Sequence, residues 1–325
     1  MNVGGILVLG GTGVIALLVI RRALRIRRAV SKWKLVASSV GLSLRPRGFF
    51  RVAITGGSRG IGAACIDLLR EYPTVEVMNL SRSASTAESI HVDLCKPESV
   101  RAAASELRSR WLGHSHSAIG GHDILINNAG VFGSHSYRDT VLTNLIAPCF
   151  LTETLASSVS DIKQSVREFR VVNVGSRLER NSNLSAIEFG GFASTIRNPS
   201  DNIRSANEAY ADSKRGLMFH TAHMCSRFSG CKQLSFTAVT PGMVNTSLGQ
   251  NSVSPFLWYL TAPLRFLFIR HPIEGAVAVL WAAFAGENGT YSADPGEVLE
   301  RISETRDVRA GALVSDLVHE IISPV

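Results

Sequence analysis

Short apolar runs of strand length alternate with longer helical stretches along most of the chain. Four of these runs are Phe49–Ile54, Thr74–Leu80, Ser89–Val92 and Ile124–Ile126. Helices are expected over Ala63–Leu69, from Pro97 onward and over Pro272–Phe284. Runs of Ile, Leu and Val without polar alternation are typical of strands buried on both faces of a parallel sheet. The alternation therefore predicts an α/β fold with a doubly wound parallel sheet in a single domain.

An uncharged run of 18 residues, Val3–Ile20, precedes the first expected strand. As a helix rising about 1.5 Å per residue, it is just long enough to cross a bilayer core. Seven basic residues follow at once: Arg21, Arg22, Arg25, Arg27, Arg28, Lys32 and Lys34. The length and apolar character of this run predict that residues 1–34 form a hydrophobic membrane anchor helix. Because positive charge stays on the cytoplasmic side, the N-terminus should face the lumen. We expect the endoplasmic reticulum membrane, with the large domain in the cytosol.

Other interpretations of this start stay open. An acid-free, Arg-rich segment is also typical of mitochondrial or plastid targeting. The glycines in the run weaken helix propensity, so a helix that lies in the membrane interface is an alternative to a membrane span. A cleaved signal peptide fits less well, because the basic residues follow the apolar run. Leu9–Gly13 imitates a dinucleotide-binding turn, but no β-α-β pattern continues it. Pro46 and the flanking glycines place a linker at 35–48, before a domain at 49–305 and a peripheral C-terminal tail at 306–325.

The net charge of +8 is concentrated at the start of the chain. Residues 1–51 carry ten Lys or Arg and no acid, so the remainder carries −2. A near-neutral domain argues against nucleic-acid binding and leaves a membrane or targeting role for the charge.

The cysteines and histidines give no sign of a metal site. The five cysteines form no C-x-x-C pair, which suggests reduced thiols in a reducing compartment. His114, His116 and His122 cluster in a segment rich in Gly and Ser, and apart from Asp123 no carboxylate completes a ligand set. We expect a polar loop there and no metal.

A glycine-rich turn joins the first strand to the first helix, reading Thr55-Gly56-Gly57-Ser58-Arg59-Gly60-Ile61-Gly62. Strand, glycine turn and helix is the context that a dinucleotide-binding loop requires. The glycines let the backbone approach a pyrophosphate, and the helix N-terminus presents oriented N–H groups to it. The turn predicts a Rossmann-type fold, with the cofactor at Gly56, Ser58, Arg59, Gly60, Ile61 and Gly62.

The end of the second strand indicates which cofactor is bound. A carboxylate at this point binds the ribose 2′-hydroxyl of NAD and repels a 2′-phosphate. This chain has Ser81-Arg82-Ser83 instead, and Arg59 lies in the glycine turn. Two guanidinium groups suit a phosphate dianion, so the sequence predicts NADP(H). The alternative is that both arginines are simply solvated.

Tyr210 and Lys214 are four residues apart, so on a helix they share one face. A neighbouring cation favours the phenolate and lowers the pKa of a tyrosine. A shift of three units requires about 4 kcal/mol, more than an exposed ion pair supplies, so such a pair has to work in a shielded cleft. The functional interpretation is an acid–base unit for carbonyl–alcohol redox chemistry, and the plain one is a chance pattern on a surface helix.

From about Arg51 to Asp294, the chain resembles the short-chain dehydrogenase/reductase family. Its motifs occur here in order, and together they make chance similarity unlikely. They are the glycine turn, Asp93, Asn127–Gly130, Asn144, the strand Val171–Ser176, the Tyr210/Lys214 pair and Pro241–Thr246. The resemblance implies further cofactor contacts at Asp93, Leu94, Asn128, Ala129, Gly130, Tyr210, Lys214, Pro241, Gly242, Val244 and Thr246.

The resemblance also implies the catalytic roles. Tyr210 would exchange a proton with the carbonyl oxygen, and Ser176 would orient and polarise the carbonyl. Lys214 would lower the pKa of Tyr210 and hydrogen-bond the nicotinamide ribose, and Asn144 would hold a water that links Lys214 to solvent. A homodimer through the helices that carry Asn144 and Tyr210 is expected by analogy alone.

Within the family, the chain is most similar to membrane-anchored, retinol dehydrogenase-like reductases. The similarity rests on the N-terminal anchor, the NADP preference and the segments Phe256–Leu260, Phe266–Phe268, His271–Ala276 and Gly289–Tyr291. The polar segment Arg177–Ala206 is longer than expected for that group, and because it should border the pocket, it leaves the substrate open. The aromatic residues between Phe256 and Phe268 form either a core helix pair or an apolar pocket wall or membrane-dipping lid.

The leading hypothesis is an NADP(H)-dependent oxidoreductase that interconverts a lipophilic aldehyde or ketone and its alcohol, in lipid metabolism. Retinal, a fatty or isoprenoid aldehyde and a ketosteroid are the candidate substrates. A second hypothesis is a non-catalytic, NADP(H)-binding regulatory membrane component. A third is a soluble organellar reductase whose first ~30–50 residues are cleaved as a transit sequence.

Overall fold

The computed structural model describes residues 3–83, 86–112, 120–133, 135–161, 167–198, 205–246 and 269–323, with side chains from residue 16 onward except Ser303. The predicted aromatic segment Phe256–Phe268 lies outside these residues, as do His114 and His116.

One eight-stranded sheet forms the centre of the domain, in the order β3-β2-β1-β4-β5-β6-β7-β8. Neighbouring strands from β3 to β7 are parallel, and β8 pairs antiparallel with β7. The strands are β1 (Phe50–Thr55), β2 (Val75–Ser81), β3 (Ser89–His91), β4 (Gly121–Asn127), β5 (Arg167–Val174), β6 (Leu234–Val239), β7 (Thr290–Ser292) and β8 (Val298–Arg301). The predicted α/β fold with a Rossmann-type, doubly wound parallel sheet in one domain is confirmed.

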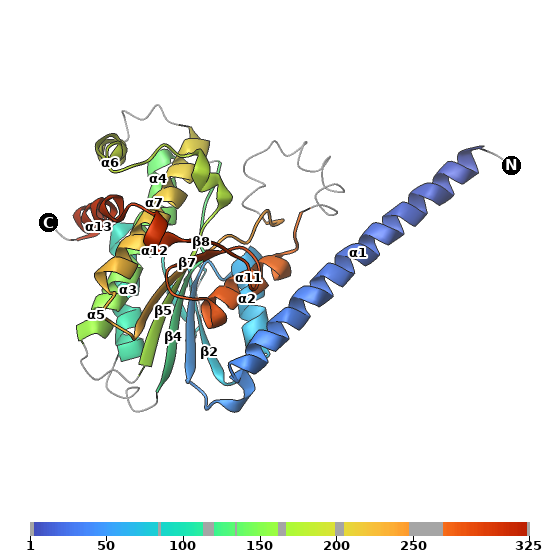
Figure 1. The fold of residues 1–325 in the computed structure, drawn as a ribbon, viewed down its shortest axis with the longest axis horizontal. Helices are drawn as coiled ribbons and strands as arrows, with labels where there is room; N and C mark the ends of the chain where they lie inside the picture. Colours follow the sequence, from blue (N-terminus) through green and yellow to red (C-terminus); the bar gives the residue numbers. More distant parts are fainter. Residues whose placement is uncertain are drawn as a thin grey trace.

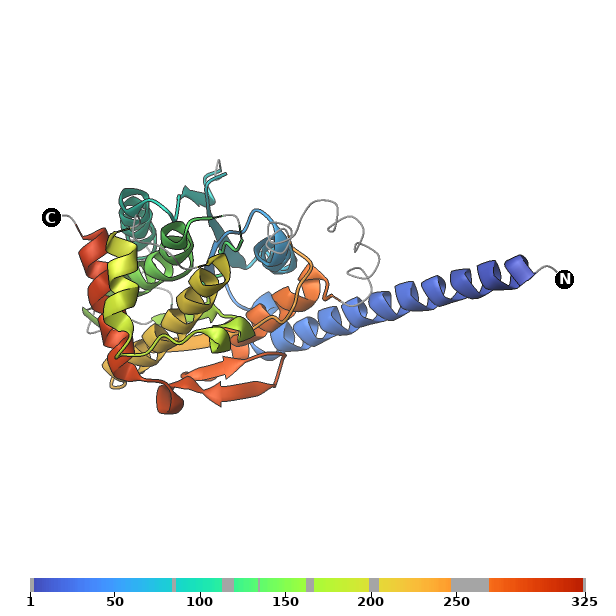
Figure 2. The same ribbon diagram turned by 90° about the horizontal axis from the view of Figure 1, so that it is seen from above.

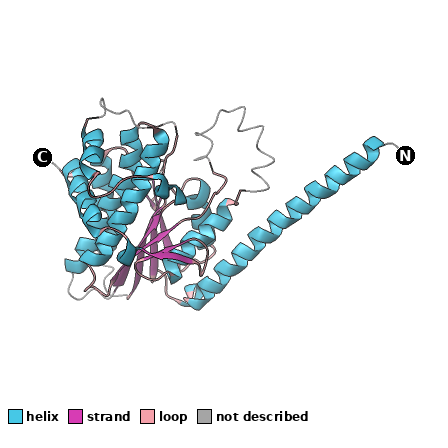
Figure 3. Ribbon diagram, turned by 45° about the horizontal axis from the view of Figure 1, so that its top comes forward, coloured by secondary structure: helices cyan, strands magenta, loops and turns pink. Residues whose placement is uncertain are grey.

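Helical layers cover both faces of the sheet (Figure 3). On one face lie α1 (Val3–Ser39), α2 (Gly60–Arg70) and α11 (Pro272–Ala285). On the other lie α3 (Pro97–Leu112), α4 (Tyr137–Val141), the π-helical turn η2 (Leu142–Ile146), α5 (Ala147–Asp161) and α7 (Ala206–Arg227). Successive side chains of a strand point alternately into the two helical layers. Val52 and Ile124 are buried on the first face, whereas Ala53 and Leu125 are buried on the second.

The sequence pattern predicted the starts of several elements closely. α3 begins at Pro97, as expected for a proline in the first turn of a helix. α11 begins at Pro272 and is capped by His271 and Glu274. β4 is longer than the predicted Ile124–Ile126, because His122 and Asp123 also pair with β1 and β5, and Gly121 pairs with β5.

Helix α1 extends away from the domain at its N-terminal end and packs against it at its C-terminal end (Figure 1). Trp33 and Ala37 are buried, and the Trp33 ring meets those of Tyr72 and Phe284 edge-on at 6.0 and 5.6 Å. The predicted boundary between anchor and linker at residue 34 does not end the helix, which continues to Ser39 because this stretch packs into the core.

The predicted membrane span, Val3–Ile20, falls mostly on residues whose side chains are not described. Across the part of the chain that the structure describes, none of the helices has both the length and the apolar character needed to cross a membrane.

The C-terminal region is not a peripheral tail as predicted. Arg301 is followed by α12 (Ile302–Thr305) and α13 (Val308–Ile322). Ala310, Val314 and Val318 are buried, and a Cβ on Gly311 would lie 2.2 Å from the Phe219 carbonyl oxygen of α7. Figure 2 shows α13 beside α6 (Phe189–Arg197), at the far end of the domain from α1. The prediction overlooked the apolar face that this helix packs against the domain.

All five cysteines are free. Within the described residues, no group of His, Cys, Asp and Glu side chains is arranged to hold a metal ion. His122 instead stacks on Phe50 and lies 3.2 Å from Glu168.

Candidate active and cofactor site

The glycine turn is shaped by contacts that exclude side chains. Gly56 follows β1 with φ of 69°, and a Cβ there would lie 3.0 Å from the Cα of Ala129. A Cβ on Gly62 would lie 2.5 Å from the Gly56 carbonyl oxygen. Only glycine fits at these two positions, so the turn is a tight cradle at the N-terminus of α2.

The loop after β4 is bound to this turn. The Asn128 side-chain amide donates to the Thr55 and Gly56 carbonyls at 2.9 and 3.4 Å, and the Ala129 N–H donates to the Thr55 hydroxyl at 3.0 Å. Gly130 follows, and a Cβ there would be 3.4 Å from Asn144 Oδ1 and 3.8 Å from Lys214 Nζ. The predicted cofactor loop and the predicted catalytic side chains therefore meet at Gly130.

A third loop approaches the glycine turn from the end of β6. Thr246 contacts Gly60, and Val244 and Ile61 both lie against Gly275 of α11. Gly242 has φ of 75°, and the Pro241 carbonyl accepts from Arg270 at 3.3 Å. The structure thus brings the predicted residues of Pro241–Thr246 beside those of the glycine turn.

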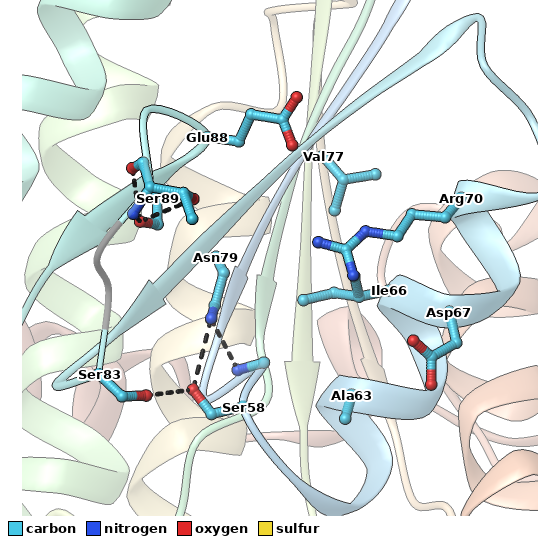
Figure 4. Close-up of a pocket in the computed structure, with 12 residues that line it drawn as sticks. Ser58, Ala63, Ile66, Asp67, Arg70, Val77, Asn79, Ser83, Glu88 and Ser89 are labelled. Carbon is cyan, nitrogen blue, oxygen red and sulfur yellow. Dashed lines mark hydrogen bonds between the residues drawn. The ribbon is translucent and has the colours of Figure 1, made fainter.

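The adenosine end of the predicted site is rich in hydroxyl groups. Ser58 Oγ lies 3.0 Å from Ser81 Oγ and 2.7 Å from Ser83 Oγ, and the Gly57 N–H donates to Asn79 Oδ1 at 3.0 Å. Gly57, Ser58, Asn79 and Ser83 line one side of a pocket of about 290 Å³ between α2 and β2 (Figure 4). Asn79 and Ser83 were not predicted. The available signal for Asn79 was a polar residue between the apolar Val77, Met78 and Leu80.

The other predicted residues at this end are placed as follows. Arg59 and Arg82 are exposed beside the serine cluster. Asp93 is half-buried, and its carboxylate accepts from the Cys95 N–H at 3.2 Å, whereas Leu94 is buried. Nothing in these contacts distinguishes NADP from NAD.

Tyr210 and Lys214 lie on α7, near its N-terminus. The helix begins with a capping box in which the Ser205 hydroxyl accepts from the Glu208 N–H and the Glu208 carboxylate accepts from the Ser205 N–H. Both Tyr210 and Lys214 are buried. Lys214 Nζ donates to the Val174 carbonyl at 2.7 Å and lies 5.9 Å from the centre of the Tyr210 ring. Ser176 comes two residues after Val174, and its hydroxyl lies close enough to Tyr210 to lower the pKa of the phenol.

The electrostatics of this pair differ from the expectation. Burial raises the pKa of Tyr210, and the Ser176 hydroxyl counters only part of that rise. Burial lowers the pKa of Lys214 to about 8. The predicted lowering of the Tyr210 pKa by Lys214 is absent from this arrangement, because the ammonium group is hydrogen-bonded to a main-chain carbonyl and the low-dielectric surroundings favour the neutral form of both groups.

Asn144 lies on the π-helical turn η2, a feature that often marks functional sites. Its side chain accepts from the Val131 N–H at 2.8 Å and donates to the Val131 carbonyl at 3.0 Å. It also donates to the Ser213 hydroxyl at 3.2 Å. Asn144 therefore holds the strand-to-helix loop against α7, and its predicted role in a water relay stays a prediction.

Phe132 was missed by the sequence reasoning. Its ring centre lies 4.8 Å from that of Tyr210, so it covers the phenol on the side of the loop after β4. An isolated Phe in a loop carries no sequence signal of such a position.

Comparisons with known proteins agree with this geometry. Residues 51–190 match the model of a family described as short chain dehydrogenase. The chain is 27% identical over 214 residues to "Uncharacterized oxidoreductase TDA5" of Saccharomyces cerevisiae, covering 61% of this chain and 56% of that protein. It is 28% identical over 253 residues to "Dehydrogenase/reductase SDR family member 13" of Bos taurus, covering 76% of this chain and 59% of that protein. The chain thus spans less than two thirds of either relative.

Solved structures show the same fold. The 3-alpha-hydroxysteroid dehydrogenase of Pseudomonas sp. B-0831, complexed with NADH, has a TM-score of 0.56 at 24% identity, covering 72% of this chain and 89% of that one. The NADPH-bound carbonyl reductase from chicken fatty liver has a TM-score of 0.53 at 19% identity, covering 79% and 99%. The family model over residues 51–190 and the curated relatives thus support a likeness of this chain to the short-chain dehydrogenase/reductase family.

Proposed function

We propose that the protein is an NADP(H)-dependent oxidoreductase that interconverts a lipophilic aldehyde or ketone and its alcohol. The observation that carries the proposal is the meeting of the half-buried Ser176 with the buried Tyr210 and Lys214 in one site that adjoins Gly130 of the cofactor loop. Such a site joins a proton donor to the place where a dinucleotide would lie.

The cradle fits a dinucleotide. Gly56 and Gly62 leave backbone where a side chain would block a pyrophosphate, and the N-terminus of α2 faces the same turn. NADP(H) would be held by the glycine turn, the loop after β4 and Pro241–Thr246, and it would supply the hydride.

The chain's own residues would handle the proton. Tyr210 holds its proton, because burial raises its pKa, and is thus ready to donate to a carbonyl oxygen. Ser176 is placed to donate a hydrogen bond to the same oxygen, which stabilises the charge that develops there. Lys214, whose Nζ lies 5.9 Å from the centre of the Tyr210 ring, would hydrogen-bond the nicotinamide ribose of the cofactor.

The preference for NADP(H) over NAD(H) rests on Arg59 and Arg82. Both are exposed beside Ser58, Ser81 and Ser83, so they are free to turn towards a 2′-phosphate. The absence of a carboxylate at the end of β2 supports the same preference.

The proposal of a lipophilic substrate at a membrane, as in retinol dehydrogenase-like reductases, rests on α1. The sequence Val3–Ile20 is apolar, and the side chains of Leu17, Ile20 and Leu24 are exposed. We place the protein at the endoplasmic reticulum membrane with its domain in the cytosol, and a mitochondrial or plastid membrane is the alternative. In one chain, α13 packs against α7. A homodimer that forms through α7 would therefore form with α13 in place on that helix.

The soluble form with a cleaved transit sequence is the weaker alternative. Loss of residues 1–50 would remove Trp33, Ala37 and Leu42 from the core. The non-catalytic regulatory alternative would be favoured by a damaged catalytic set, and the set is complete in this chain.

The test is oxidation of NADPH or NADH by the detergent-solubilised protein with retinal, a long-chain aldehyde and a ketosteroid, with Tyr210→Phe as the control. Turnover that requires Tyr210 and favours NADPH is expected. Tight NADPH binding without turnover on any of the three carbonyls would support the regulatory alternative.

A further inference from the structure

The segment that follows Ser176 forms the short 3-10 helix η3 (Arg177–Asn181). Ser176 is the N-cap of this helix, and its Oγ accepts from the Leu178 N–H at 3.3 Å. The same hydroxyl is the side-chain neighbour that lowers the pKa of Tyr210. The direction of the Ser176 hydroxyl therefore depends on where η3 is held.

The far end of this segment is held by a buried carboxylate of α7. The Ser182 hydroxyl donates to Asp212 Oδ1 at 2.5 Å, and the Tyr137 hydroxyl donates to Asp212 Oδ2 at 2.7 Å. Asp212 is only 4% exposed and lies between Tyr210 and Lys214 along the helix. Hydrogen bonds from hydroxyl groups to a buried carboxylate are short and strong, so Ser182 is tied to the helix that carries the proton donor.

The middle of the segment is held by a charge pair from the C-terminal region. Glu179 is fully buried and accepts two hydrogen bonds from Arg306, each of 3.0 Å. Arg306 also donates to Glu300 of β8 at 2.6 and 2.9 Å. A buried carboxylate that loses its cation is costly, so Glu179 keeps η3 against the segment between β8 and α13.

We propose that Asp212 and Arg306 are positioning residues for Ser176, which act through Ser182 and Glu179 to fix the serine hydroxyl beside Tyr210. This inference rests on the proposed carbonyl–alcohol chemistry. Neither residue touches the reacting atoms. Their effect is on geometry, where a displacement of about 1 Å can lower a rate by about 100-fold.

The first experiment compares Ser182→Ala with Tyr137→Phe. Each removes one hydroxyl donor to Asp212, but only Ser182 belongs to the segment that starts at Ser176. With retinal, the long-chain aldehyde and the ketosteroid as probes, we expect kcat to fall about tenfold in Ser182→Ala. We expect Tyr137→Phe to stay within about twofold, with similar losses of thermal stability in both and unchanged affinity for NADPH.

A double-mutant cycle with Ser176→Ala separates positioning from general destabilisation. If Ser182 acts through the Ser176 hydroxyl, Ser182→Ala has no further effect on kcat once that hydroxyl is gone. A loss of kcat that is the same with and without the Ser176 hydroxyl would overturn the proposal.

The second arm compares Arg306→Gln with Arg301→Gln. Arg301 also lies in the C-terminal region, but its partner is the exposed Glu287 at 3.0 Å. Hydrogen exchange at the Leu178 and Glu179 amides, in the full-length protein, should become faster in Arg306→Gln and Ser182→Ala and stay unchanged in Arg301→Gln. Because Arg306→Gln leaves Glu179 unpaired, Arg306→Gln combined with Glu179→Gln serves as the folded variant, and it should show the same faster exchange.

The outcomes are distinguishable. Tyr210-dependent turnover that is insensitive to Ser182→Ala overturns the positioning role and leaves the proposed function intact. Absence of wild-type turnover on all three carbonyls refutes the proposed function, and the positioning role falls with it. Unchanged exchange at Leu178 and Glu179 in both variants overturns the structural basis of the proposal.

Discussion

Lys214 donates its hydrogen bond to the carbonyl of Val174, the last residue of β5, two positions before Ser176. One side chain of α7 therefore ties the helix that carries Tyr210 to the strand that leads into the serine. The relative placement of the two groups depends on a buried ammonium group, which costs stability and contributes order to the site.

Replacement of Tyr210 by Phe removes the proposed proton donor and keeps the ring that packs against Phe132 at a tilt. We expect kcat to fall by about 10²- to 10⁴-fold, the usual contribution of general acid–base catalysis. The dissociation constant for NADPH, measured by fluorescence, should stay within about twofold. Residual activity near the wild-type rate would assign the proton transfer to another group.

Replacement of Lys214 by Met should raise stability at neutral pH while abolishing activity. Burial lowers the pKa of Lys214 to about 8, below its ordinary value of 10.5, so the unfolded chain binds more protons between these two values. Stability of the wild type therefore rises with pH in that window, and the full penalty is present below pH 8. Urea unfolding at pH 7 and pH 9.5 should show the advantage of the variant shrinking at the higher pH. An advantage that grows with pH would contradict the assignment.

Glu153 should stabilise the contact between α5, α7 and α13. Burial alone would raise its pKa, but hydrogen bonds from His220 and Ser315 and the nearby His319 lower it to about 2, and Arg227 lies 3.8 Å away. This stabilisation is complete above pH 4.5, the ordinary value, and is lost as the pH falls towards 2. Glu153→Gln should lower the free energy of unfolding at pH 7 by about 2–4 kcal/mol. Denaturation at pH 3 should show a smaller difference, and an equal difference at both pH values would argue against a charge effect.

Removal of a guanidinium group should weaken the preference for NADPH. Arg82→Ala is expected to raise KM for NADPH about tenfold, the loss of one charge-assisted contact, and to leave KM for NADH within about twofold. Arg108→Ala, an exposed position on α3, is the control. Equal changes for both nucleotides would show that Arg82 does not read the 2′-phosphate.

Truncation should separate two roles of α1. Deletion of residues 1–20 should release the protein from membrane fractions while leaving Tm unchanged, because Trp33 and Ala37 remain in place. Deletion of residues 1–40 removes both from the core, and Trp33→Ala alone should cost about 3–5 kcal/mol. Thermal unfolding and carbonate extraction of the full-length and shortened proteins check this. A stable protein without residues 1–40 would revive the cleaved, soluble alternative.

Local signals in the sequence were enough to predict the sheet and the cofactor cradle. The glycine turn, the apolar strands and the prolines at the starts of α3 and α11 depend on residues close together in the chain. The contacts that position Ser176 depend on partners 30 residues apart for Ser182 and Asp212, and 127 apart for Glu179 and Arg306. No local pattern encodes such pairs, so an Asp between Tyr210 and Lys214 carried no meaning on its own.

Two predictions from the sequence, the peripheral C-terminal tail and the lowered pKa of Tyr210, were wrong for different physical reasons. The apolar residues of α13, among them Ala310, Val314, Leu317 and Val318, recur at helical spacing and were available as a signal. The direction of the Tyr210 pKa shift could not be predicted from the sequence. The proximity of Lys214 on the helix suggested a lowered pKa, whereas burial, which depends on the whole fold, raises it.

The continuous course of α1 has a mechanical consequence. Its 37 residues span about 55 Å as one helix. Arg25 lies 3.5 Å from Glu274 in the first turn of α11, and Gly275 of that turn contacts Val244. Helix α1 is therefore connected to the loop beside the nucleotide cradle through the first turn of α11. If the N-terminal end of α1 is bound to a membrane or a partner, its orientation would fix the orientation of the cofactor site. A rotation of α1 would be transmitted through α11 to Val244.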